Sequence, residues 1–179
     1  SFPKVINKNN KDELPDSIPA SLDEAILSFI LVCTIRRVRK QTTAHNSMLI
    51  NVASFIKWID KIAYLVNERL NDFKLSIESD DDYLLGKLKY LYENDFVYRT
   101  EQVINNLEYK DSKIQVHKWD NIRLELKNAV RKITVRALHS CKKINTLYYQ
   151  NVEELDYNKY KNEGISVIAV GGNRLSRGI

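Results

Sequence analysis

The hydrophobic positions of the chain follow two patterns, one typical of helices and one typical of buried strands. Three short apolar runs lie near 48–53, 134–139 and 166–170, each bounded by polar residues or glycine. Near-continuous apolar runs of this length are typical of strands in parallel sheets, which are covered on both faces. Helical patterns lie between them, so we predict a predominantly helical α/β protein with a small parallel sheet.

The helical patterns place apolar residues at steps of three and four. The first helix is predicted after Pro19, where Ser21 and Glu24 have the spacing of a capping box. Its apolar residues fall on several faces, so we expect it to be buried. The second is predicted to begin at Ser54 as N-cap and is amphipathic, with these apolar positions: Phe55, Ile59, Ile62, Val66, Leu70 and Phe73.

Further helices are predicted after the acidic run Asp80–Asp82, over about 100–107, from Trp119 to Val130, and over 152–160. Acidic residues stabilise the positive end of a helix dipole, which explains the acidic run without a metal.

The first two predicted strands are separated by more residues than one crossover helix needs, so we expect a helical insertion at about 80–130. The predicted division is an extended lead-in with a buried helix over 1–45, followed by an α/β unit over 46–179.

Composition narrows the class of protein only moderately. Hydrophobic residues make up 44% and charged residues 28% of the chain, as in folded soluble proteins. No apolar run is long enough for a membrane span, and no secretory signal is visible. Cys33 and Cys141 form no metal-binding motif, so we expect a cytoplasmic protein. The net charge of +5 is compatible with nucleic-acid binding.

The most distinctive candidate site is the segment 171–178, which follows the third apolar run and contains glycines and arginines. Glycines allow the backbone to approach a ligand closely, and arginines suit phosphate groups. Ligands of α/β sheets collect at the carboxyl ends of the strands, where this segment would lie. The alternative is a strand-to-helix turn with solvated arginines. The predicted phosphate-binding or nucleic-acid-binding residues are Gly171, Gly172, Asn173, Arg174, Ser176, Arg177 and Gly178.

Other polar groups have simpler explanations. The basic run Arg36–Lys40 suits a helix C-terminus, with a phosphate-facing patch as the alternative. His45, His117 and His139 are isolated and are expected to be structural, although His45 and His139 flank strands and could border a cleft. No P-loop, no nucleophile elbow and no zinc motif is present, so we predict no catalytic residue and no metal ligand here.

Three segments resemble the second RecA-like domain of superfamily II helicases: NSMLINVASF, VRALHS and YKNEGISVIAVGGNRLSRG. The match is closer to the Z-one domain family of predicted bacterial endonucleases, which the chain resembles in three blocks. These blocks are Pro19 to Ile26, His45 to Ile50, and Val170 to Gly178.

The resemblance implies a helicase-like, DNA-dependent ATPase of a restriction or defence system, acting with nuclease or ATPase partner subunits. Residues 171–178 would correspond to helicase motif V, which contacts the nucleic-acid backbone. ATP and Mg²⁺ would bind only together with a first RecA-like domain, with the P-loop before Ser1 and the arginine finger after Ile179. Two alternatives are a metal-dependent DNA endonuclease that uses Asp80–Asp82, and a non-catalytic helical interaction module.

Overall fold

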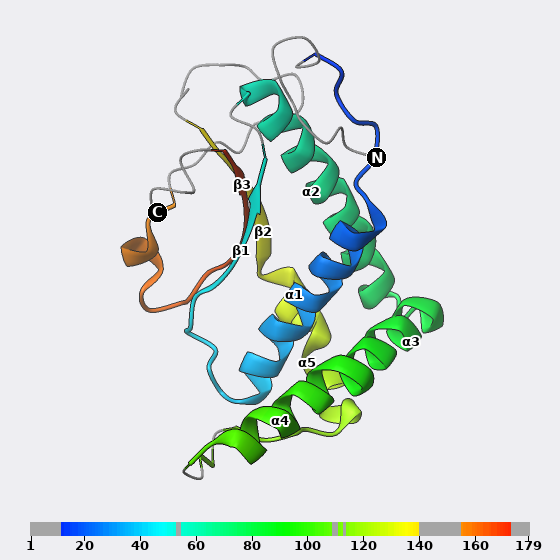
Figure 1. Ribbon diagram of the computed structural model, residues 1–179, viewed down its shortest axis with the longest axis vertical. Helices are drawn as coiled ribbons and strands as arrows, with labels where there is room; N and C mark the ends of the chain where they lie inside the picture. Colours follow the sequence, from blue (N-terminus) through cyan, green and yellow to red (C-terminus); the bar gives the residue numbers. More distant parts are fainter. Residues whose placement is uncertain (1–11, 53–54, 109–110, 113, 140–154, 173–179) are drawn as a thin grey trace.

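The predicted α/β fold with a small parallel sheet is confirmed. The computed structural model describes residues 12–52, 55–108, 111–112, 114–139 and 155–172. The sheet contains β1 (Asn46–Asn51), β2 (Ile133–Leu138) and β3 (Ser166–Gly171) in the order β1-β3-β2, and both neighbouring pairs are parallel (Figure 1). The observed strands differ from the predicted ranges by at most two residues at either end. The last strand along the chain therefore occupies the centre of the sheet.

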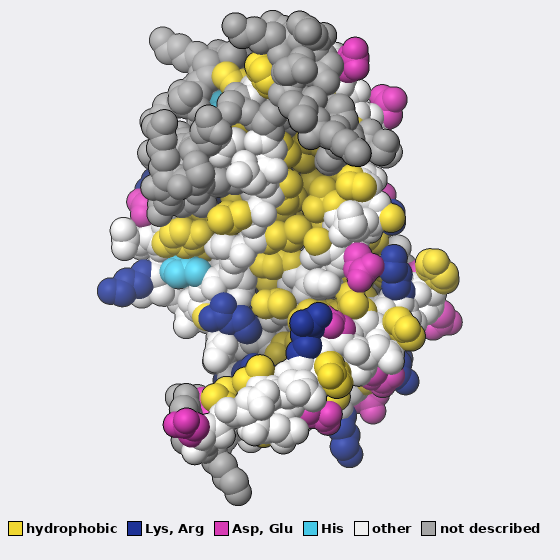
Figure 2. All heavy atoms as spheres, in the orientation of Figure 1, with side chains coloured by type: hydrophobic (Ala, Val, Ile, Leu, Met, Phe, Trp, Pro, Cys, Tyr) yellow, Lys and Arg dark blue, Asp and Glu magenta, His cyan; other side chains and the backbone are white. Residues whose placement is uncertain are grey.

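Two helices lie along one face of this sheet, α1 (Ala20–Val38) and α2 (Ile56–Glu78), and α5 (Trp119–Arg131) packs against both of them near the amino end of β2 (Figure 1). The predicted apolar stripe of α2 is confirmed, because all its members from Ile59 to Phe73 are buried and only Phe55 is partly exposed. The main core joins the helices to β2 and β3 and includes Ile26, Ile30, Ile62, Val66, Leu126, Val130, Val135 and Ile168. Figure 2 shows apolar side chains reaching the surface along the seam between the sheet and these helices.

The opposite face of the sheet carries a smaller core. Val167 and Ala169 of β3 pack there with Leu138, Leu155 and Ile165, and Tyr157 and Tyr160 of the short helix η2 (Tyr157–Tyr160) cover them. The connection from β1 to β2 thus covers one face, and the described part of the connection from β2 to β3 covers the other. The connection from β1 to β2 crosses the sheet in one direction, and the connection from β2 to β3 returns in the other. Two right-handed crossovers that run in opposite directions lie on opposite faces of a sheet.

Two predicted helix starts are corrected. α1 begins at Ala20 with Pro19 as N-cap, and no side chain caps it, so the capping box at Ser21 is wrong. The backbone N–H groups of Leu22 and Asp23 donate to the Pro19 carbonyl. The helix therefore starts before Ser21, which lies inside the first turn and is not the N-cap. The N-cap of α2 is Phe55 rather than Ser54, which lies outside the described residues.

A helical arm extends from α2 and consists of α3 (Asp82–Leu91), the π-helix η1 (Tyr92–Val97) and α4 (Tyr98–Asn106) (Figure 1). The acidic start of α3 is confirmed, because the Asp81 carboxylate accepts a hydrogen bond from the backbone N–H of Leu84 at 2.7 Å. The helix predicted over about 100–107 is α4, which continues without a break from η1.

The segment 80–130 thus holds both the arm and α5, and α5 belongs to the main core. That this segment is an insertion stays a prediction. Of the helix predicted over 152–160, the described residues contain only η2, and 152–154 lie outside them.

Gly164 lets the turn before β3 pack against the turn before β1. Its φ is +69°, and a Cβ on it would lie 2.7 Å from the backbone carbon and oxygen of Thr43. Beside it, the N–H of Ile165 donates to Nδ1 of His45 at 3.3 Å, and the carbonyl of Ile165 accepts from the N–H of Asn46 at 2.7 Å. The start of β3 is therefore aligned with the start of β1 by a close backbone approach.

We predict that Gly164→Ala lowers the free energy of unfolding by about 2–4 kcal/mol, because alanine is strained at positive φ and its methyl group meets backbone that cannot rotate away. The matched control is Gly86→Ala in α3, where an added Cβ meets nothing within 4 Å. That change should raise stability by about 0.5–1 kcal/mol through helix propensity. Urea unfolding of both variants measures the two effects, and a Gly164→Ala protein as stable as the parent would contradict the proposed packing.

Candidate functional site

The parallel register brings the carboxyl ends of all three strands to one edge of the sheet. Gly171 lies between Asn51 of β1 and Leu138 of β2 in the pairing. The N–H of Val52 donates to the Gly171 carbonyl at 2.8 Å. We call the residues gathered here the carboxyl edge: Asn51, Val52, His139, Gly171 and Gly172.

The central strand is buried up to this edge. All six residues of β3 are buried, and Val167–Val170 have no exposed surface. Gly172 is buried as well. Because glycine has no side chain, the backbone amides at the end of β3 are covered by no side chain of their own, which is the condition for close approach of a ligand to the backbone.

A buried acid–histidine pair lies beside the glycines. Nε2 of His139, which directly follows β2, lies 3.0 Å from Oδ1 of Asp60 in the first turns of α2. His139 is 6% exposed and Asp60 is 1% exposed. The pair therefore fastens the beginning of α2 to the end of β2 within the low-dielectric interior.

Burial raises the pKa of Asp60, because removing a carboxylate from water disfavours its charged form, and the neighbouring His139 opposes this increase. An acid whose pKa is higher in the folded than in the unfolded state lowers stability as the pH rises through that interval. The histidine thus reduces the free-energy cost of a buried carboxylate at neutral pH.

Sequence reasoning identified His139 as a residue flanking a strand but missed Asp60. A signal was present, because Asp60 is a charged residue in the apolar face of an amphipathic helix, next to Trp58 and Ile59, which are also buried. Charged residues are seldom buried unless they are paired. The partner could not be read from the sequence, since it is 79 residues away.

The sequence-predicted site residues divide into two groups. Gly171 and Gly172 lie at the carboxyl edge, as expected. The other five lie outside the described residues: Asn173, Arg174, Ser176, Arg177 and Gly178.

The basic run at the end of α1 makes contacts within the protein. Nη1 of Arg36 donates to the His45 carbonyl and to Oδ1 of Asn46, both at 2.8 Å. Arg37 pairs with Glu125 of α5 at 3.0 Å, and Arg39 donates to the Gln115 carbonyl at 3.2 Å. These contacts support a structural interpretation, although the arginines join separate elements rather than only stabilising the helix dipole.

The remaining candidates also have structural contacts. Nδ1 of His45 accepts the Ile165 N–H, and the backbone of His117 exchanges hydrogen bonds with the Tyr92 hydroxyl. In the acidic run, Asp81 caps α3 and Asp80 pairs with Lys127 at 2.6 Å.

Within the described part of the chain, no group of three or more potential metal ligands occurs. None of its helices has the length and apolar composition that crossing a bilayer requires.

We predict that His139→Ala lowers the free energy of unfolding by about 3–5 kcal/mol at pH 7, because Asp60 is left buried without its partner. The loss should be smaller near pH 4, where a larger fraction of Asp60 is protonated and neutral. Adding Asp60→Asn to this variant should restore part of the stability. Urea unfolding at both pH values measures these effects, and a double variant that loses the sum of the two single losses would show that the residues are not coupled.

Comparison with known proteins gives one match. The family model of the Z1 domain matches residues 21–179. No curated protein and no solved structure gives a significant match. The family match covers the second and third sequence blocks, the first block from Ser21 onward, and all the described strands and helices except Ala20, the first residue of α1. The resemblance to the Z-one family is confirmed, and the chain belongs to the Z1 domain family.

Proposed function

We propose that this chain is the second RecA-like half of a DNA-dependent ATPase or translocase, and that it meets nucleic-acid and nucleotide phosphates at the carboxyl edge of its sheet. The whole protein would serve a restriction or defence system in the cytoplasm, with nuclease or ATPase subunits as partners. ATP and Mg²⁺ would bind between this half and a first RecA-like domain. On this proposal the chain alone does not hydrolyse ATP.

One observation carries the proposal: the central parallel strand ends in two buried glycines, with its neighbours' carboxyl ends on either side. Open parallel sheets bind ligands at this edge, where backbone N–H groups point away from the sheet. In the sequence, Arg174 and Arg177 stand two and five positions after Gly172. Their guanidinium groups have the geometry for two parallel hydrogen bonds to a phosphate.

The His139–Asp60 pair supports the same proposal as a positioning device. It connects the edge to α2, whose stripe of apolar side chains is part of the main core. A phosphate that shifts the residues of the carboxyl edge would therefore also shift α2, which packs against the sheet. Such a connection between the ligand edge and the packed helices is what a module coupling ATP to DNA requires.

A second candidate function, a helical interaction module, is supported by the exposed residues of the arm. α4 contains no buried residue, and Tyr83, Tyr90 and Tyr98 along the arm are 84%, 69% and 59% exposed. Tyrosine is enriched in protein interfaces. These residues favour the interaction-module alternative for the arm, whereas the capping and ion-pair contacts of Asp80 and Asp81 leave the endonuclease alternative without a specific observation in its favour.

We predict that Arg177→Ala lowers DNA-stimulated ATP hydrolysis of the intact protein by about 10- to 100-fold, the loss expected when one charge-assisted hydrogen bond to phosphate is removed. Thermal unfolding should be unchanged. Arg99→Ala is the matched control, because Arg99 lies on the arm, is exposed, and pairs with Asp95 four residues earlier on the arm.

Equal turnover in the Arg177→Ala and parent proteins would remove the proposed phosphate contact. If turnover instead fell with Arg99→Ala, the arm rather than the carboxyl edge would be the functional surface.

A further inference from the structure

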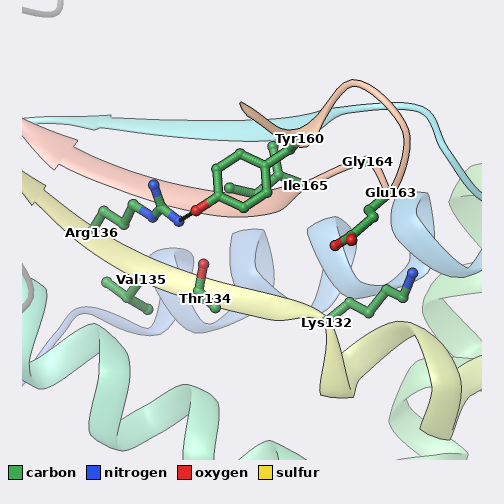
Figure 3. Close-up of a pocket in the computed structure, with 8 residues that line it drawn as sticks. All are labelled: Lys132, Thr134, Val135, Arg136, Tyr160, Glu163, Gly164 and Ile165. Atoms are coloured by element: carbon green, nitrogen blue, oxygen red, sulfur yellow. Dashed lines mark hydrogen bonds between the residues drawn. The ribbon is translucent and has the colours of Figure 1, made fainter. Parts of the chain in front are cut away.

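A hollow lies at the other end of the sheet, away from the carboxyl edge. It is an open groove of about 450 Å³ between β2 and the turn that leads into β3. Its lining residues are Lys132, Thr134, Val135, Arg136, Tyr160, Glu163, Gly164 and Ile165 (Figure 3). This volume lies within the range of small-molecule sites.

Three polar side chains of the groove are exposed to solvent: Lys132, Thr134 and Glu163. They make no side-chain hydrogen bond or ion pair with any described residue. Figure 3 shows Lys132 and Glu163 from opposite walls, with the Thr134 hydroxyl directed toward the space between β2 and Tyr160. One wall therefore offers an ammonium group and a hydroxyl group, and the other a carboxylate.

The aromatic ring of Tyr160 is held in place by Arg136. Nη2 of Arg136 donates to the Tyr160 hydroxyl at 3.0 Å, and the guanidinium carbon lies 5.3 Å from the ring centroid. Arg136 is itself only 7% exposed. A ring fixed at its hydroxyl end gives the groove a rigid flat surface, which a planar ligand can contact at little entropic cost.

We propose that this groove binds a nucleotide unit whose base carries an amino group. The phosphate would lie against Lys132 and Thr134, the base against Tyr160, and the amino group would donate to the Glu163 carboxylate. Ammonium and hydroxyl groups bind phosphate, aromatic rings stack on bases, and acidic side chains accept from the amino group of cytosine. The same unit can come from a free mononucleotide or from single-stranded nucleic acid.

The proposal does not depend on the phosphate contacts proposed for the carboxyl edge. The groove is lined by residues at the amino end of β2, by Tyr160 and by residues 163–165, whereas Gly171 ends β3 at the opposite edge and Gly172 follows it. A loss of DNA-stimulated ATP hydrolysis with Arg177→Ala would therefore concern the carboxyl edge. A loss of nucleotide binding with a substitution of Lys132 or Glu163 would concern the groove.

The test compares CMP and UMP, which have similar size and differ in the group that would meet Glu163. Calorimetric titration of the 179-residue chain should show CMP binding about tenfold more tightly than UMP. Glu163→Gln should remove this preference, because an amide can also donate to the uracil carbonyl. Lys132→Gln should weaken both ligands, whereas Lys159→Gln, the same charge change on a neighbouring exposed residue outside the groove, should leave both unchanged.

Free CMP and a short cytidine oligonucleotide distinguish the two sources. Tighter binding of the oligonucleotide, lost with Lys132→Gln, assigns the groove to single strands, and tighter binding of free CMP assigns it to mononucleotides. The proposal is overturned if neither ligand binds at about 10 mM, or if Lys132→Gln and Lys159→Gln have equal effects. Equal affinity for CMP and UMP in the parent protein also overturns it.

Discussion

The structure depends on the burial of β3 between two parallel neighbours. Val167–Val170 are inaccessible to solvent, so the main-chain N–H and C=O groups of this segment must be paired within the sheet. β1 and β2 supply these hydrogen bonds, and the two hydrophobic clusters cover the two faces. Without β3, β1 and β2 would have no common neighbour, and the sheet would not exist.

The same pairing of β3 with β1 and β2 gives each end of the sheet a candidate binding surface. At the amino end, the close approach at Gly164 aligns the beginnings of β1 and β3, and the adjoining turn forms one wall of the groove. At the carboxyl end, the shared register pairs Leu138 with Gly171, and His139, the next residue, contacts Asp60 on α2. Two separate candidate surfaces thus result from one strand pairing, and they can be tested separately.

The sequence predicts those parts of the structure that repeat along the chain. The apolar runs locate all three strands, and the stripe of α2 is correct from Ile59 to Phe73, because periodic burial leaves a periodic sequence. Helix starts are less predictable, since α1 begins after Pro19 without any side-chain cap, although Ser21 and Glu24 have the spacing of a capping box. The glycines of the carboxyl edge follow from their position after an apolar strand.

Contacts between distant parts of the chain could not be predicted in this way. Asp60 and His139, or Gly164 and Thr43, become neighbours only after the strands are ordered, and no local pattern specifies that β3 lies between β1 and β2. The groove depends equally on residues from β2 and from the turn before β3. The basic run of α1 shows the same limit, because its partners lie on α5, at the start of β1 and in two loops.

We propose that phosphate ligands meet this chain at the carboxyl ends of its strands. Amide hydrogen exchange of the intact protein, with and without single-stranded DNA and a non-hydrolysable ATP analogue, measures this directly. The account predicts additional protection in peptides that contain Gly171–Gly172 and in those that contain His139. Protection confined to the helical arm, with no change at the carboxyl edge, would contradict it.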